Sequence, residues 1–388
     1  MIAITKEKYY DIIVFSLLFT LSFSKALPTI FLGILIPFFF IKIFKKQFLF
    51  PTGKGYYIFS FLFLYLIIKS LFNTTISDDI SLYSRYLIVI VIPFLFIPVS
   101  KNTIKLGVII SVFTAVLIAV FHIIVYYLSF KSLPLSNGSQ VNELLVIERP
   151  YFGFVCLIAS IICLNLANEF PKYKKGLYFL SLFFIVFIFF IAARLSLITV
   201  VGLLFVYFSF YSGFSLFKKM LILVVSLGLI ILVLLSYKNL SNRFYISENI
   251  EIIKDYEPRF VIWKCASEIQ NEDNFNTFFG GKSNLWIQDQ LNQCYFDSIE
   301  KETKRDWFLK SQFNTHNQFI GFFLAGGVIG FLLFLLFLVS LFKASNNFYM
   351  LSIVLSISLF FIMENVLHRQ FGCYLTAIII SLLLKKDK

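Results

Sequence analysis

The sequence predicts an all-α polytopic membrane protein, and two observations support this class. Of the 388 residues, 59% are apolar and only 14% are charged, and the mean hydropathy is +0.86. A water-soluble globule does not have this composition. Apolar runs such as residues 177–193 and 220–237 are long enough, at about 1.5 Å of rise per residue, to cross a hydrocarbon core of about 30 Å. Because lipid offers the backbone no hydrogen-bond partners, such runs must be helices.

About twelve membrane spans are expected along the chain. The first follows two lysines and has no small-residue cleavage site after it, so it is expected to be a signal anchor. We therefore divide the chain into nine spans over residues 1–237, an outer segment over 238–314, and three spans with a short tail over 315–388. The spans lie near residues 9–24, 27–44, 55–72, 82–99, 106–130, 150–168, 176–193, 195–216, 220–237, 316–342, 346–363 and 371–384.

The basic residues predict that both termini lie on the inner side of the membrane. Of the 34 lysines and arginines, seventeen fall in the inner segments and seven in the short outer connections. The remaining ten lie in residues 238–314, a segment too long for the positive-inside rule to count. The net charge of +13 is therefore mainly an inner-face anchor to the lipid bilayer. It does not predict a nucleic-acid partner.

The outer segment carries twelve acidic and ten basic residues and is expected to hold short helices rather than a large domain. Its stretch "DYEPRFVIWKCASEIQ" predicts a helix with a proline in the first turn. The apolar positions that recur on one face of that helix are Phe260, Trp263, Ala266 and Ile269.

Three acidic or cysteine features are candidates for further sites. Cys265 and Cys294 share the outer segment, where an oxidising compartment would allow a disulfide, but the sequence leaves their pairing open. Asp78 and Asp79 are adjacent and could hold a divalent cation, although the start of a helix is the favoured interpretation. Glu364 is expected to pair with an arginine rather than to bind metal. No CxxC motif or Cys/His cluster indicates zinc.

Cationic side chains gather at the outer starts of several spans. The positive end of a helix dipole points outward there, so each cation is unfavourable by a few tenths to about 1 kcal/mol. A bound diphosphate would supply the compensating anion. Snorkelling to lipid phosphates is the alternative, and for Arg85 and Arg369 both remain open. The residues concerned are Arg85, Arg149, Arg194, His316 and Arg369.

Arg194 and His316 are the most informative members of this group. Arg194 interrupts the apolar stretch "FFIAARLSLITVVG", so its charge is expected to be held by the protein or by a ligand. His316 is the candidate general base, since an imidazole titrates near neutral pH; a capping or headgroup histidine is the alternative. His368, beside Arg369, is a candidate for support of the same site.

Several stretches together resemble the O-antigen ligase and O-antigen polymerase superfamily. "RFVIWKCASEI", "FFGGKSNLW" and "THNQFIGFFLAGGVIGFLLF" resemble its C-terminal signature, in which an Arg and a Trp four apart precede a Gly-rich segment and a His-Asn helix start. "AARLSLITVVGLL" resembles the family's Ser-Arg helix start, with Ala193 where serine is common. "ERPYFGFVCLIA" and "MENVLHRQFGCYLTAII" also resemble members. The resemblance covers roughly residues 149–384.

The resemblance implies a membrane-embedded glycosyltransferase with a GT-C-like fold. Such an enzyme takes a glycan from undecaprenyl diphosphate at the periplasmic face of the bacterial inner membrane and, in ligases, attaches it to lipid A-core to complete lipopolysaccharide. The family pattern assigns diphosphate binding to Arg194 and Arg259 and activation of the acceptor hydroxyl to His316. It implies no metal and no cofactor. Residues expected to bind substrate or line the site are Arg149, Arg369, Asn317, Trp263 and His368.

Other activities remain open at this stage. A polymerase of the same superfamily would use a second repeat unit as acceptor, and a protein O-oligosaccharyltransferase would use a protein. A lipid-linked sugar transporter belongs to a different class, but such proteins usually show internal repeats and charges at mid-membrane. This chain shows no convincing repeat, and its cations crowd one face. With one base and no nucleophilic side chain required, a single displacement would invert the anomeric linkage.

Overall fold

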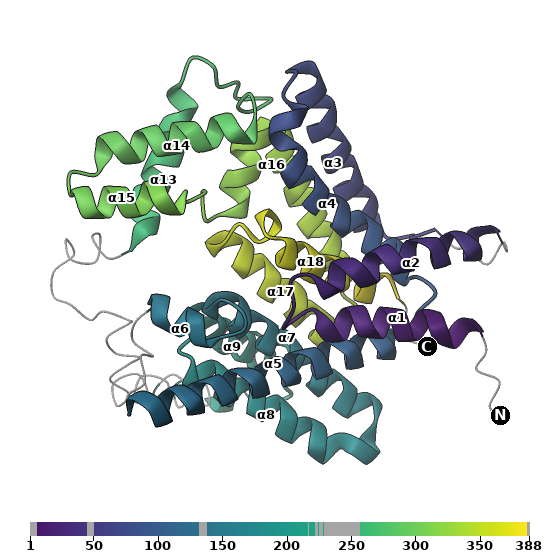
Figure 1. Cartoon of the computed structure of the whole chain (residues 1–388). Helices are drawn as coiled ribbons and strands as arrows, with labels where there is room; N and C mark the ends of the chain where they lie inside the picture. The colour runs from purple at the N-terminus through teal and green to yellow at the C-terminus, as the bar shows by residue number, and fades with distance from the viewer. Residues whose placement is uncertain are drawn as a thin grey trace. The chain divides into compact units, whose positions relative to one another are not determined.

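The computed structural model describes residues 6–44, 50–131, 138–215, 217–221 and 257–385, together with residues 224 and 228. Apart from one isolated β-bridge, these residues form helices, turns and loops (Figure 1). They fall into two compact units. Unit 1 is built from the described residues within Met1–Phe48, Pro98–Ile246 and Asn346–Ser356, and unit 2 from those within Leu49–Ile97, Ser247–Ser345 and Ile357–Lys388.

Unit 1 is organised around α7 (Arg149–Glu169), which is buried along most of its length. It packs against α5 (Lys101–Phe130), α8 (Lys174–Phe190) and α9 (Arg194–Val206), and α1 (Lys6–Thr20) packs on α5. Because α7 has apolar side chains on every face, it can serve as the central helix of the unit. The remaining elements are α2 (Leu27–Phe44), α6 (Gly138–Leu144), the 3₁₀ turn η1 (Pro171–Tyr173) and the π-helical turn η2 (Tyr207–Tyr211).

Unit 2 consists of long apolar helices and a group of short polar ones. α16 (Gln318–Ala344) packs along α3 (Lys54–Phe72), and α18 (Gln370–Leu384) packs along α4 (Ile76–Phe96). α17 (Phe348–Met363) contributes its residues up to Ser356 to unit 1 and the rest to unit 2. The short elements are α13 (Pro258–Glu268), η3 (Ile269–Asn271), α14 (Asn284–Ser298), α15 (Glu302–Ser311) and η4 (Val366–His368).

Seven helical stretches in the described residues are long and apolar enough to cross a membrane, and four shorter apolar helices accompany them. The protein is therefore a polytopic, all-α membrane protein, as predicted, while the count of about twelve spans stays a prediction. The ninth predicted span, near 220–237, lies almost entirely outside the described residues, as do residues 238–256 of the outer segment. The seven stretches are Lys54–Phe72, Ile76–Phe96, Lys101–Phe130, Arg149–Glu169, Pro171–Phe190, Arg194–Tyr211 and Gln318–Ala344.

The short helices α13, α14 and α15 share a small apolar core that contains Tyr295 and Phe308. The helix predicted around Pro258 is confirmed. Of the predicted apolar face, Ala266 and Ile269 are buried, whereas Phe260 is 51% exposed. The buried side of α13 combines these two residues with neighbours that also recur at helical spacing. The side chains on that face are Ile262, Cys265, Ala266 and Ile269.

Asp79 ties this group of short helices to the long ones. It lies with Asp78 in the first turn of α4, so the favoured interpretation of the acidic pair is confirmed. Its Oδ1 accepts hydrogen bonds from the backbone and side-chain amides of Asn284, at 2.8 and 3.0 Å. Its Oδ2 accepts from Ser70 at 2.6 Å and lies 3.2 Å from the Tyr83 hydroxyl. The buried carboxylate thus holds the start of α14 against α3 and α4.

Replacing Asp79 with alanine is expected to destabilise the protein by about 3 kcal/mol, since several buried donors lose a charged acceptor at once. Thermal unfolding of the purified protein in detergent measures the loss. Asp78→Ala is the matched control, because Asp78 is exposed and its replacement is expected to cost under about 0.5 kcal/mol. Equal losses for the two variants would contradict the anchoring role.

Candidate functional site

A buried carboxylate in unit 2 holds two of the three predicted catalytic residues together. Glu364 follows the last residue of α17. Its Oε1 accepts a hydrogen bond from Arg259 Nη2 at 2.9 Å, and its Oε2 lies 3.1 Å from His316 Nδ1. Arg259 comes from the first turn of α13, and His316 lies just before α16. Three segments distant in sequence therefore meet at one side chain, and we call Arg259, His316 and Glu364 the Glu364 cluster.

The cluster is largely shielded from solvent. The Glu364 side chain is 7% exposed, whereas those of His316 and Arg259 are 19% and 22% exposed. Burial alone would raise the pKa of Glu364, but the hydrogen bond from His316 and the charges of His316, Arg259 and Arg369 outweigh burial and lower that pKa. Glu364 is therefore ionised. The expectation that it pairs with an arginine is confirmed, with Arg259 as the partner.

The hydrogen bond to Glu364 fixes the orientation of the His316 ring. An ionised carboxylate only accepts hydrogen bonds. Nδ1 of the imidazole therefore carries the hydrogen atom and donates a hydrogen bond to Glu364. In the neutral ring the lone pair then lies on Nε2, which is the atom able to accept a proton. The His316 backbone is in the left-handed region at φ +42°, and its N–H donates to Asn314 Oδ1 at 3.0 Å. Residues held in this region cluster at functional sites.

Arg259 is held by two carboxylates and a carbonyl group. Besides Glu364, its Nη1 donates to Glu257 at 2.7 Å and its Nε donates to the Met363 carbonyl at 3.2 Å. A guanidinium has five N–H groups. Three of them donate to these acceptors, and the other two have no partner among the described residues. Glu257 is the more accessible carboxylate, with 28% of its side chain exposed.

A hydrogen-bond network fixes the short loop that carries His316. Trp263 Nε1 donates to the Thr315 carbonyl at 3.0 Å, and Asn365 Nδ2 donates to Thr315 Oγ1 at 2.7 Å. Gln318 Oε1 accepts from the Leu367 backbone at 2.8 Å. Trp263, predicted to bind substrate or to serve the structure, here supports this loop from α13.

Asn317, predicted from the sequence to bind substrate, is the N-cap of α16. Its side-chain oxygen accepts from the backbone N–H groups of Phe319 and Ile320, at 2.9 and 3.1 Å. This is the usual way to satisfy the first orphan donors of a helix. The capping role considered for His316 therefore belongs to Asn317, and the His316 imidazole is left for Glu364.

His368 and Arg369 lie where η4 meets α18. Burial lowers the pKa of His368 to about 4, helped by the charges of Arg85 and His316, so this imidazole is neutral at physiological pH. For Arg85 the sequence left open whether it binds a diphosphate or reaches to lipid phosphates. Its Nη1 donates a hydrogen bond to the His368 carbonyl. Arg369 is half-buried, and its charge contributes to the lowered pKa of Glu364. Both predicted substrate-binding residues therefore adjoin the Glu364 cluster.

Arg149 and Arg194 belong to unit 1. Arg149 opens α7 with its side chain buried, and its backbone N–H donates to Asn142 Oδ1 at 3.0 Å. Arg194 opens α9 with its side chain exposed, two residues after Ala192, whose φ is +53°. The predicted place of Arg194 at a helix start is confirmed, while its role toward a ligand stays a prediction.

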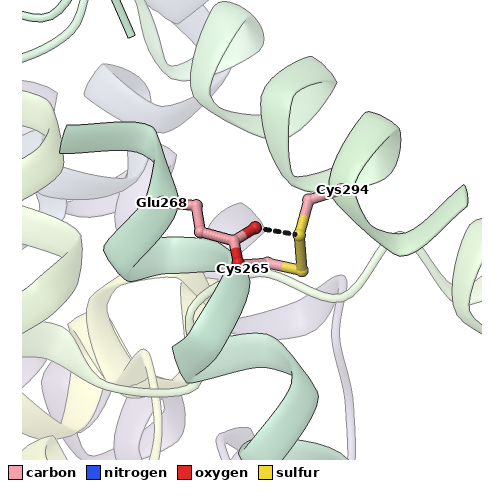
Figure 2. Close-up of side chains that lie close together, drawn as sticks. All are labelled: Cys265, Glu268 and Cys294. Atoms are coloured by element: carbon pink, nitrogen blue, oxygen red, sulfur yellow. Dashed lines mark hydrogen bonds between the residues drawn. A yellow bond between two sulfur atoms is a disulfide. The ribbon is translucent and has the colours of Figure 1, made fainter. Parts of the chain in front are cut away.

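A disulfide joins α13, which carries Arg259, to α14. Cys265 and Cys294 are bonded with their Cα atoms 5.6 Å apart (Figure 2), so the pairing that the sequence left open is formed. Glu268 Oε2 lies 3.1 Å from Cys294 Sγ. Two sulfurs and a carboxylate could in principle bind a metal ion, but metal ligation requires thiolates, and the disulfide uses both. We therefore regard this group as a covalent tether.

The fold and the Glu364 cluster define a polytopic membrane protein with a shielded site that combines an arginine, a carboxylate and an imidazole. Residues 179–335 match the O-antigen ligase family, in agreement with the resemblance noted in the sequence. The matched segment includes Arg194, Arg259 and His316, whereas Glu364 lies beyond it. Members of the family are membrane enzymes of the glycosyltransferase type that act on lipid-linked glycans. No curated protein matches the chain.

Reduction of the Cys265–Cys294 bond is expected to lower the stability of the outer helices. The cysteines are 29 residues apart, and closing a loop of that size stabilises the folded state by about 3.6 kcal/mol in the chain-entropy estimate. A Cys265→Ser/Cys294→Ser variant should therefore melt earlier in detergent, and a reductant should lower the melting temperature of the wild type only. A Cys156→Ser variant keeps the tether and controls for loss of a cysteine. Unchanged melting of the double variant would contradict this role.

Proposed function

We propose that this protein transfers a glycan from undecaprenyl diphosphate to an acceptor sugar at the periplasmic face of the bacterial inner membrane. The single observation that carries the proposal is the Glu364 cluster, in which a carboxylate fixes an imidazole beside an arginine. The reaction needs a base for the acceptor hydroxyl and positive charge for the departing diphosphate. The family match supports the lipid-linked donor. In this proposal both termini are cytoplasmic.

His316 acts as the general base in this mechanism. Its Nε2 takes the proton of the acceptor hydroxyl while Glu364, hydrogen-bonded to Nδ1, stabilises the positive charge that forms on the ring. The hydroxyl oxygen attacks the anomeric carbon as the bond to the diphosphate breaks. One displacement inverts the linkage, and the proton leaves later from His316 to solvent.

Arg259 and Arg369 receive the negative charge of the leaving diphosphate. The N–H groups of Arg259 that no described residue engages donate to the diphosphate. The diphosphate also displaces Glu257, the more exposed of the two carboxylates on this arginine. Arg369 adds a second charge beside the cluster. For Arg149 and Arg194, in unit 1, diphosphate binding stays a prediction from the sequence.

The acceptor is proposed to be a sugar of lipid A-core, as in the ligases of the family. Purified protein given a lipid-linked glycan with and without lipid A-core tests this choice. A ligated product that forms only with the core acceptor supports the ligase. A ladder formed without it would identify a polymerase instead, and glycan movement across vesicles without any transfer would identify a transporter.

Replacing His316 with alanine is expected to lower the transfer rate by a factor of about 10² to 10⁴, the usual contribution of a general base. Single-turnover transfer from the lipid-linked donor measures the effect. His122→Ala is the matched control, because that histidine lies in α5 and its Nδ1 only approaches the Leu144 carbonyl at 3.3 Å. An active His316→Ala protein with normal membrane insertion would remove His316 from the mechanism.

Glu364→Gln is expected to slow transfer by a factor of about 10 to 10³, because the amide keeps the shape of the carboxylate but loses the charge that stabilises the protonated ring. The variant should also shift the pH at which the rate falls, which a purely structural loss would not do. Glu257→Gln removes the other carboxylate on Arg259 and should change the rate less than about threefold. Equal effects in the two variants would argue against the pairing of Glu364 with His316.

A further inference from the structure

A short hairpin between α13 and α14 closes on itself through its own backbone and one side chain. We call residues 276–282 the outer hairpin. Asn276 and Gly280 pair as an isolated β-bridge, with N···O distances of 2.5 and 3.3 Å. Asn276 Oδ1 also accepts from the backbone N–H groups of Phe278 and Phe279, at 2.9 and 3.1 Å. The turn is thus locally ordered, and its two phenylalanines stand at the tip.

The outer hairpin fills a break in the membrane helix α16. Gly327 has φ +61° and ψ −158° within that helix, so the helical hydrogen bonds around it are interrupted. The hairpin replaces them: Val328 N–H donates to the Thr277 carbonyl at 2.9 Å, and Ile329 N–H donates to the Phe278 carbonyl at 3.3 Å. In return the Gly281 N–H donates to the Leu324 carbonyl at 2.8 Å.

The approach of these two backbones requires glycine on both sides. A Cβ atom on Gly280 would lie 2.6 Å from Gly327 N, and one on Gly327 would lie 2.3 Å from the Phe278 carbonyl carbon. Both glycines also have positive φ, at +82° and +61°, where side chains are strained. The sequence "FFGGK" followed by "AGGVIG" therefore encodes the contact directly.

Two polar side chains of α3 complete the contact from the neighbouring membrane helix. Lys69 Nζ donates to the carbonyls of Gly281 and Ala325, and the Tyr65 hydroxyl donates to the Gly326 carbonyl at 2.8 Å. These groups satisfy the carbonyls that the break exposes. Irregular backbone is tolerated at membrane depth only where the protein supplies such partners.

The depth of the contact follows from the two helices that hold it. Val328 lies 15 residues before Lys343, and Lys69 lies 15 residues after Lys54. We place the opposite membrane surface at these two lysines, because basic residues are expected on the inner side. At about 1.5 Å per residue, both sites are about 22 Å into a core of about 30 Å. The outer hairpin therefore lies about 8 Å below the surface on the His316 side.

The hairpin tip presents aromatic surface at this depth. Phe278 is 64% exposed and Phe279 is 51% exposed. The two helices that hold the hairpin expose apolar side chains at neighbouring levels, Ile68 on α3 and Leu332 on α16. The phenylalanines thus continue an apolar surface that already belongs to membrane-spanning helices. At this depth, exposed apolar rings are favourable against hydrocarbon and unfavourable against water.

We propose that residues 276–282 form a re-entrant hairpin that enters the leaflet on the His316 side, where Phe278 and Phe279 contact the acyl chains of the membrane lipids. The partner is thus the lipid hydrocarbon itself. The inference does not depend on the proposed transferase activity, because it uses only backbone contacts, exposure and depth. It distinguishes this hairpin from α14 and α15, whose sequences carry several charged and polar residues.

Spin labelling of the full chain in phospholipid vesicles tests the proposal. The three free cysteines, Cys156, Cys163 and Cys373, are first replaced by alanine, and a nitroxide is attached at Phe278→Cys. We expect its collisions with oxygen to exceed those with a water-soluble nickel complex by about tenfold. Phe296→Cys on α14 is the matched control, since Phe296 is 53% exposed, and should favour the nickel complex. Equal access of the nickel complex to both sites would overturn the proposal.

A second measurement uses the unmodified protein, so it does not depend on the folding of a variant. Phosphatidylcholine with a photoactivatable diazirine in its acyl chain is cross-linked to the reconstituted chain, and the adducts are mapped by mass spectrometry. The peptide that contains Phe278 and Phe279 should be labelled, as should the lipid-facing stretch around Leu332. Labelling of the Leu332 peptide without the hairpin peptide would contradict the re-entrant position.

Discussion

The arrangement of the site depends on one buried charge, the carboxylate of Glu364. An ionised carboxylate taken out of water is costly unless cations and donors surround it. Arg259 and His316 supply that compensation, so the outer helix α13 and the start of α16 must meet where α17 ends. The interaction that makes the carboxylate tolerable is also the one that sets the imidazole tautomer. Stability and chemistry thus rest on the same pair of hydrogen bonds.

The membrane imposes a second constraint, on the backbone of α16. A helix broken at Gly327 must find partners for its freed amides and carbonyls, and these come from the hairpin, Lys69 and Tyr65. The helical segment above the break, residues 318–326, is therefore fixed at both ends. Its upper end is capped by Asn317, and the loop before that cap carries His316. A short rigid segment between two anchors gives the imidazole a defined place.

The sequence predicted the class of the protein well, because hydropathy is a property of each segment alone. The helix around Pro258, the start of α9 at Arg194 and the link between Glu364 and an arginine also follow from local pattern and charge. The buried face of α13 does not follow from the local pattern, because two overlapping sets of apolar residues have helical spacing. Only the packing against Tyr295 and Phe308 determines which set is buried. The cap at Asn317 was open to prediction from its residue type.

The identity of the arginine that pairs with Glu364 could not be predicted, for a reason that is general to such sites. The neighbouring Arg369 is close in sequence, yet the partner is Arg259, 105 residues away, and His316 is 48 residues away. No local periodicity encodes a contact over such separations. The sequence does indicate that Glu364 needs a cationic partner, because an acidic residue at the end of an apolar helix stays ionised only if cations or hydrogen-bond donors surround it. In a chain with so many cations, a buried anion is unusual, and the cations that approach Glu364 mark the candidate site.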